Sequence, residues 1–478
     1  IRRPPRSTRK ESSAASDVYK RQIDYAYSYY MSAGQGARLT MPLVDISASN
    51  LSKVSLYVDV LHNRADNFHD RWEFVARAGN EATTLGDYVR DSGTPLFKDG
   101  LITGADTGIE VDIQTFPFRD LLATLEVRGN AKADDIDVIF VDAPLVPSYA
   151  VRGMIAPMDS YFSDANVNEI FAPAGIAAAS WNGEMYAPPL NNSGQILYYN
   201  KDLLAKAGCA EPSVIESERI TWEQVVDCAQ KINDEGSGTW GMIFDQVSRY
   251  YQLQALPESL GGGSGVCEGG LSVKGCLTND GWMKAAQWYY DIHNTWNVSP
   301  KGANPDQTHE MFGAGKIGIF VGGSWNVGRW KDSDLNFGLA LHPYFEGGDV
   351  VTGCNSWHMG VWNYSKQKDA SALLVRYLTA SPDVALTFVD VHNSLPAHMS
   401  GILHVAEDPK FNNFPDTAMK LATYESANHC ATRGRTPGFL EFEEIVNTSF
   451  EDIRNGGDPA SVMQSAETRI EQSMRRYK

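Results

Sequence analysis

Residues 181–208 read WNGEMYAPPLNNSGQILYYNKDLLAKAG. Small polar residues interrupt two apolar stretches that are typical of strands, and an amphipathic helix is predicted to follow them. A strand that leads into a helix is common in α/β proteins, so this stretch alone does not decide the fold. The segments on either side of it complete the pattern.

The sequence before this stretch predicts a parallel sheet. Residues 54–60 (VSLYVDV), 109–116 (IEVDIQTF) and 137–143 are short runs rich in β-branched and aromatic residues, which is typical of strands. Helix-like stretches at 68–78 and 118–127 separate them. This alternation of strands and helices predicts an α/β domain with parallel strands.

The sequence after it predicts helices with clear start signals. Thr221 and Gln224 have the spacing of a capping box before an amphipathic run that Gly236 ends. Asp458 and Pro459 are a suitable N-cap and first-turn pair for the last helix. The second half is therefore mostly helical around the strands.

Length and charge limit the kind of protein. A chain of 478 residues exceeds what one hydrophobic core usually serves, so two lobes are expected. Its 43% hydrophobic and 21% charged residues are those of a globular protein, and no run approaches the ~18 apolar residues of a membrane span. The net charge of −18 disfavours nucleic acid and anionic membranes as partners.

The N-terminal segment differs from the rest of the chain. Residues 1–22 resemble a translated sequencing adaptor and carry seven Lys or Arg and two Asp or Glu, so the remainder has a net charge of −23. We expect residues 23–52 to be an extension of the domain, without an assigned role. No signal peptide precedes the domain, and we expect that the adaptor has replaced the authentic start.

The even number of cysteines is consistent with disulfides formed in an oxidising compartment. The alternative is buried free thiols. Sequence alone leaves 15 pairings open, although the short Gly-rich loop between Cys267 and Cys276 favours that bridge. Cys209 with Cys228 and Cys354 with Cys430 complete the predicted set. No spacing indicates a zinc site, and no cofactor motif is present.

Residues 181–208 resemble the signature of extracellular solute-binding proteins of carbohydrate ABC importers (family 1, similar to maltose-binding protein). Four more segments resemble the family in its own order: 137–149 (DVIFVDAPLVPSY), 221–232 (TWEQVVDCAQKI), 311–327 (MFGAGKIGIFVGGSWNV) and 436–455 (TPGFLEFEEIVNTSFEDIRN). The resemblance implies an α/β, two-lobed periplasmic-binding-protein fold of type II, in which hinge strands link lobes that are discontinuous in sequence.

The resemblance also implies where the lobes begin and end. Hinge crossings are expected near residues 188–194, 341–344 and 393–398. The expected lobes are listed by their segments: 53–190 with 343–395 for the first, and 191–342 with 396–478 for the second.

Sugar binding needs aromatic faces and planar polar side chains in a concave cleft. With 11 Trp and 21 Tyr in the chain, abundance alone selects nothing, so the family's binding loops are used to choose candidates. The resemblance implies these ligand-binding residues: Asp59, His62, Asp142, Asn191, Asn192, Ser193, Asp245, Tyr250, Gly323, Trp325, Gly353, Asn355, Trp357 and Arg435.

Several candidates have a structural alternative. Asp142 either faces the cleft or caps the turn that follows it, and residues 191–193 would also form an ordinary turn. Trp325 follows a strand that ends in two glycines, so its ring either folds back into the core or projects into the cleft. The resemblance favours projection as a stacking platform. Arg435 either binds vicinal hydroxyls or pairs with a helix or hinge carboxylate.

The resemblance implies a function in transport. The protein would bind a mono- or oligosaccharide, close about its hinge and deliver the sugar to the permease subunits of an ABC importer. It would act as a monomer at the periplasmic or extracellular face of the membrane, without catalytic residues, metal, cofactor or nucleic acid. The alternatives are a secreted carbohydrate-active enzyme, for which no catalytic motif is present, and a surface carbohydrate sensor.

Overall fold

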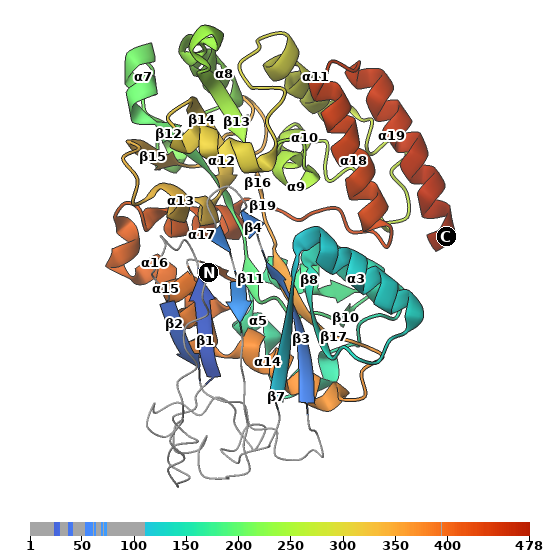
Figure 1. The fold of residues 1–478 in the computed structure, drawn as a ribbon. Helices are drawn as coiled ribbons and strands as arrows, with labels where there is room; N and C mark the ends of the chain where they lie inside the picture. The colour runs from blue at the N-terminus through green and yellow to red at the C-terminus, as the bar shows by residue number, and fades with distance from the viewer. Residues whose placement is uncertain are drawn as a thin grey trace, which may run out of the picture.

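The structure is a computed structural model of the chain, and it shows two lobes that each contain a β-sheet (Figure 1). It describes residues 110–392 and 394–478, together with these strands nearer the N-terminus: β1 (Ile23–Ser28), β2 (Ala37–Met41), β3 (Lys53–Val60), β4 (His62–Asn63), β5 (Phe68–His69) and β6 (Arg71–Glu73). The predicted adaptor at 1–22 lies outside the described residues. So does the segment 80–104, whose scattered Gly, Thr and Asp predict an inserted loop.

The sheet of the first lobe has the strand order β17-β8-β3-β7. β3 runs parallel to β7 (Glu110–Pro117) and to β8 (Val138–Asp142), so the three predicted strands are confirmed as a parallel group. α3 (Phe118–Ala131) connects β7 to β8 where a helix was predicted. The fourth strand, β17 (Trp357–Val361), comes from far along the chain and pairs antiparallel with β8.

The helix predicted at 68–78 is wrong where the structure describes it. Residues 68–69 and 71–73 form β5 and β6, and β6 pairs antiparallel with β1. The pairing partner lies in the N-terminal extension, which shows why the local pattern did not reveal it.

The sheet of the second lobe has the order β13-β14-β12-β15. Its strands are β12 (Gln195–Asn200), β13 (Trp240–Phe244), β14 (Ile317–Gly323) and β15 (Phe337–Ala340). Every residue of β14 is buried, as its apolar sequence requires. An aromatic cluster packs on this sheet, with Tyr198 contacting Phe312, Phe320 and Trp330.

Helices cover the second sheet. α8 (Trp222–Ile232) begins at the predicted capping box, in which Thr221 and Gln224 satisfy each other's backbone N–H groups. α11 (Asp280–Asn294), α18 (Phe439–Arg454) and α19 (Pro459–Met474) pack against one another on one side of this lobe (Figure 1).

The structure describes further α-helices and two short strands. They are α4 (Val146–Val151), α5 (Val167–Ile170), α6 (Pro173–Ala179), β9 (Ser180–Trp181), β10 (Glu184–Met185), α7 (Lys201–Ala207), α9 (Tyr250–Leu253), α10 (Ala255–Ser259), α12 (Pro305–Gly313), α13 (Val327–Trp330), α14 (Lys368–Ala380), α15 (Pro382–His392), α16 (Met399–Glu407) and α17 (Thr417–Asn428). Within the described residues no single helix passes the length and apolarity test for a membrane span, although the bent pair α14 and α15 passes it together.

Short paired strands connect the lobes. β11 (Asn191–Asn192) pairs antiparallel with β18 (Leu395–Pro396), where two of the expected crossings lie. β16 (Thr352–Gly353) pairs parallel with β19 (Cys430–Ala431). This second pairing lies later in the chain than the expected crossing near 341–344, which stays a prediction.

All three predicted disulfides are present in the structure. Cys209 pairs with Cys228, Cys267 with Cys276, and Cys354 with Cys430. The last of these joins the ends of β16 and β19. It therefore links two of the segments that run between the lobes.

Three buried histidines are held neutral by their surroundings. Burial lowers the pKa of His293 and of His342 to about 3, and that of His358 to about 4. His358 lies in β17, where its Nδ1 donates to the Ala187 carbonyl at 2.8 Å. In the unfolded chain a histidine has a pKa of about 6.5.

We therefore predict that stability falls as the pH drops from 6.5 towards 4. In that window the unfolded chain binds more protons than the folded one, and each such histidine contributes about 1.4 kcal/mol per pH unit. His358→Gln should reduce the loss between pH 6.5 and 5 by about 2 kcal/mol, as measured by urea unfolding at both values. Both proteins share every other titrating group, so equal losses would contradict a neutral buried His358.

Candidate functional site

A cavity of about 750 Å³ lies between the two lobes. This volume is in the range of ligand sites, which are about 300–1,000 Å³. Six of the predicted ligand-binding residues line it: Asp142, Ser193, Asp245, Trp325, Asn355 and Trp357. They come from both lobes and from the connecting strands between them, so the predicted residues that are distant in sequence meet at one cavity.

Aromatic side chains form part of the cavity wall. The ring of Trp325 lies 6.3 Å from that of Tyr251 between centroids, with 33° between the planes, and Trp357 is a third aromatic lining residue. Trp325 is partly exposed, as expected for a platform. Gly323 does not line the cavity but lies beneath this ring, where a Cβ would collide with Trp325.

A buried ion pair crosses from the first lobe to the second. Asp142 ends β8, and its carboxylate accepts hydrogen bonds from both terminal nitrogens of Arg433, one at 2.8 Å. Arg249, which precedes α9, lies 3.6 Å from the same carboxylate and 3.3 Å from Glu443. Burial opposes the charge of Arg433, yet Asp142 raises its pKa above the usual value.

The two predicted roles of Asp142, facing the cleft or capping the following turn, do not fully describe it. It lines the cavity, and its carboxylate makes no capping hydrogen bond to the turn that follows. The side chain is 7% exposed and the Arg433 side chain 3% exposed. The main role that the geometry gives this carboxylate is to hold Arg433.

Asn191 and Asn192 support the cavity from behind. Asn192 Oδ1 accepts from the Asn355 backbone N–H, and Asn191 Oδ1 accepts from that of Trp357, both at 2.9 Å. Neither asparagine lines the cavity. They fix the backbone that carries two lining residues, a role that the turn alternative for 191–193 did not include.

Ser193 and Asn355 lie at the cavity wall. Ser193 Oγ donates to the Asn355 carbonyl and accepts from the Tyr251 hydroxyl, both at 2.8 Å. Asn355 has a φ of 65°, in the left-handed region that asparagine tolerates better than most residues. Its buried Nδ2 has no hydrogen-bond partner among the described residues. This amide is an unsatisfied buried donor beside the cavity.

Asp245 is a lining residue with its charge already engaged. His309 Nε2 contacts Oδ1 at 2.6 Å, and Asn326 Nδ2 donates to Oδ2 at 2.7 Å. Burial alone would raise the pKa of Asp245, but His309, Asn326 and Arg329 together hold it below the usual value. Asp245 thus organises the second-lobe wall as an anion.

Tyr250 lies outside the cavity, contrary to its prediction as a site residue. It is fully buried, its hydroxyl donates to the Ser264 carbonyl at 2.8 Å, and its ring stacks on Trp282. Tyr251 lines the cavity instead. Consecutive residues at a helix start point about 100° apart, so only one of the two can face the cleft.

Arg435 and Gly353 also lie outside the cavity lining. Arg435 donates to the Ser180 carbonyl, and its guanidinium lies 5.7 Å from the Trp181 ring. Neither alternative considered for this arginine included a backbone carbonyl. Gly353 is buried against Gln195, which a Cβ would strike.

Asp59 and His62 stay predictions. Their backbones lie in β3 and β4, but their side chains fall outside the described part of the chain.

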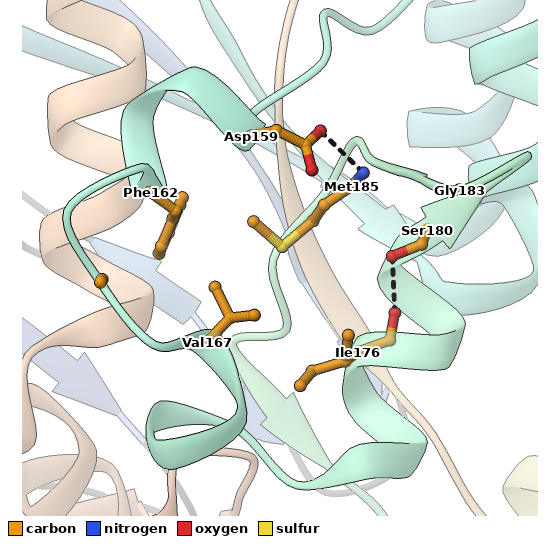
Figure 2. Close-up of a pocket in the computed structure, with 8 residues that line it drawn as sticks. Asp159, Phe162, Val167, Ile176, Ser180, Gly183 and Met185 are labelled. Carbon is orange, nitrogen blue, oxygen red and sulfur yellow. Dashed lines mark hydrogen bonds between the residues drawn. The ribbon is translucent and has the colours of Figure 1, made fainter.

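A smaller cavity of about 260 Å³ lies within the first lobe (Figure 2). Phe162, Val167, Ile176 and Met185 point towards it, and the Asp159 carboxylate accepts from the Met185 N–H at 2.9 Å. Its one carboxylate is used to hold the backbone, and no aromatic pair like that of Trp325 faces it. It lacks the features of a sugar site.

Sequence reasoning missed several lining residues, most of them cationic or aromatic: Arg249, Tyr251, Lys301, His309, Arg329, Arg433 and Arg454. Arg249 and Tyr251 flank the predicted Tyr250, and Arg433 is two residues from the predicted Arg435. The sequence therefore predicted these two segments of the site correctly. Which side chain of each segment lines the cavity could be seen only in the structure.

A comparison of the sequence with protein-family models gives a second, independent result. Residues 103–413 match the model of the bacterial extracellular solute-binding proteins, which is more than half of the sequence. The chain belongs to this family. The two lobes, the paired connecting strands and the cavity between them are therefore those of a solute-binding protein.

Named relatives are similar over long stretches. A galactooligosaccharide-binding protein of Bacillus subtilis is 22% identical over 410 residues, which is 82% of this chain and 89% of the relative. The sn-glycerol-3-phosphate-binding periplasmic protein UgpB of Agrobacterium fabrum is 27% identical over 308 residues, 60% of this chain and 65% of the relative.

A solved structure shares the fold. It is an ABC substrate-binding protein of Listeria monocytogenes in complex with cycloalternan, with a TM-score of 0.69 and 19% identity, covering 89% of this chain and 99% of that one. At this identity the likeness concerns the fold alone.

We predict that the pair of Asp142 and Arg433 is costly to break but not to replace. Asp142→Leu leaves a buried guanidinium unpaired and should lower the free energy of unfolding by about 3–5 kcal/mol. Adding Arg433→Met should restore most of this loss. Asp227→Leu, in the exposed pair of Asp227 and Lys231, is the matched control and should cost less than about 1 kcal/mol.

Urea unfolding of Asp142→Leu, of Arg433→Met, of the double variant and of Asp227→Leu gives the four losses of stability. A double variant that loses the sum of both single losses would show that the two side chains do not act as a pair.

Proposed function

We propose that this chain binds a sugar between its lobes and delivers it to an ABC importer. The observation that carries the proposal is the interlobe cavity, in which the partly exposed Trp325 offers a ring face and Ser193 and Asn355 are polar lining residues. Aromatic faces stack on the C–H surface of a sugar ring, and amides and hydroxyls bind its hydroxyls.

Hinge closure is the proposed mechanism. The lobes are taken as residues 53–190 with 343–395 and 191–342 with 396–478, and the short pairings β11 with β18 and β16 with β19 act as the hinge. A ligand that contacts both lobes binds the closed form better than the open one and so shifts the population towards closure. The closed shape is what a permease would recognise.

The relatives support the carbohydrate class and the place of action. Those described above are named for binding a galactooligosaccharide and sn-glycerol 3-phosphate, and one is named periplasmic. We place this chain at the periplasmic or extracellular face of the membrane as a monomer, with membrane permease subunits as partners. Three disulfides are consistent with an oxidising compartment.

A thermal-shift screen against sugars and polyols tests the ligand class. A ligand present at a hundred times its dissociation constant should add about 2.7 kcal/mol to the stability of the folded protein. Product analysis of the same samples should show no turnover. The proposal would be wrong if a different class of solute stabilised the protein while none of the sugars and polyols did.

Trp325→Ala tests the platform. Because Trp325 is partly exposed, apo stability should fall less than the ~3–5 kcal/mol expected for Trp282→Ala in the core. Sugar binding should weaken by about 1–3 kcal/mol, by analogy with aromatic stacking on bases. Calorimetric titration on the same preparation measures the affinity. Unchanged affinity in Trp325→Ala would remove this residue from the site.

A further inference from the structure

Basic residues outnumber acidic residues in the cavity wall, whereas acidic residues outnumber basic ones in the whole chain. The wall contains five basic residues, which are Arg249, Lys301, Arg329, Arg433 and Arg454, and three carboxylates, which are Asp142, Asp245 and Glu451. The whole chain has 41 Lys and Arg against 59 Asp and Glu. A concave site with one sign of charge concentrates ligands of the opposite sign.

Two of the three carboxylates are already bound within the protein. Asp142 accepts both terminal nitrogens of Arg433, and Asp245 is held by His309 and Asn326. Arg249 is balanced by Glu443 at 3.3 Å. The surplus of positive charge therefore lies on the part of the cavity wall that is formed by Lys301 and Arg454 of the second lobe.

Lys301 and Arg454 belong to one patch of this wall. Arg454 Nη1 donates to the Ala303 carbonyl at 3.3 Å, which places its guanidinium beside the loop that carries Lys301. Arg454 is buried, and its Nε has no hydrogen-bond partner among the described residues. Its partner Glu451, at 3.4 Å, is 57% exposed and thus well screened by water.

Lys301 is the residue of this patch whose charge has no carboxylate partner within the described part of the chain. It is exposed, and no carboxylate in the described ranges lies within salt-bridge distance of it. Asn304 and Pro305, at the start of α12, line the same wall and add the positive end of a helix dipole. The negative C-terminal end of α18 lies at Arg454 and opposes the positive end of α12. The positive charges of Lys301 and Arg454 offset the negative end of α18.

We propose that the ligand is an anionic carbohydrate: a sugar or polyol with one carboxylate or phosphate group, held by Lys301 and Arg454 while its ring faces Trp325. This inference rests on the proposed function and narrows its ligand class. Charge-assisted hydrogen bonds from ammonium and guanidinium groups to such an anion are shorter and about twice as strong as neutral ones. The neutral polar wall at Ser193 and Asn355 remains for the hydroxyls.

Calorimetric titration of the full chain with matched probes tests the ligand class. The probes are glucose, glucuronic acid and glucose 6-phosphate, then glycerol and glycerol 3-phosphate, then a neutral and a uronic-acid disaccharide. We expect at least one acidic probe to bind ten times or more tightly than its neutral partner, and that 0.5 M NaCl weakens only the acidic one. The carboxylate and phosphate arms show which anion is preferred.

Variants of Lys301 test the location. Lys301→Met should raise the Kd of the acidic probe about three- to tenfold and leave that of its neutral partner unchanged, whereas Lys301→Arg should retain the affinity. Lys284→Met removes another exposed lysine, from α11 and outside the cavity, and should change neither Kd. All four proteins should melt alike, because both lysines are exposed.

The outcomes separate this inference from the proposed function. Neutral sugars that bind as tightly as their acidic partners would overturn the anionic class and leave sugar binding in place. Acidic preference with an unchanged Lys301→Met would overturn the assigned patch. Binding of another solute class, or of no probe at all, would overturn both the anionic class and the proposed sugar-binding function.

Discussion

The contact between Asp142 and Arg433 is the interaction on which the arrangement of the site depends. It joins the end of a first-lobe strand to the segment that leaves β19, and both side chains are almost fully buried. Such a pair gains little over an apolar contact, because desolvation opposes the Coulomb attraction. Its value lies in geometry, since a buried charge without its partner is strongly unfavourable and so permits few alternative placements.

The remaining walls of the cavity follow from that placement. Arg433 also donates to the Asn355 carbonyl and lies over the Tyr251 ring at 5.1 Å, so one guanidinium orients three parts of the site. Asn191 and Asn192 then fix the chain on the other side of Asn355. The ligand-facing groups are thus set by side chains that do not themselves need to touch the ligand, as preorganised sites require.

Sequence could predict the elements and the segments of the site, but not every side chain within them. The strands around 54–60, 109–116 and 137–143 were readable because β-branched runs alternate with helices along the chain. β17 and β6 were not readable as members of their sheets, because their partners lie far away in sequence. Tyr250 and Tyr251 differ by one residue in sequence, yet one packs on Trp282 and the other faces the cavity.

The disulfide between Cys354 and Cys430 has a mechanical consequence. It closes the chain between them, with helices α14 to α17, into a covalent ring whose two ends meet at β16 and β19. Sliding β16 along β19 would stretch the bond between Cys354 and Cys430, whereas turning the two strands together would not. The bond therefore restricts shear within this strand pair and lets the pair turn as a unit.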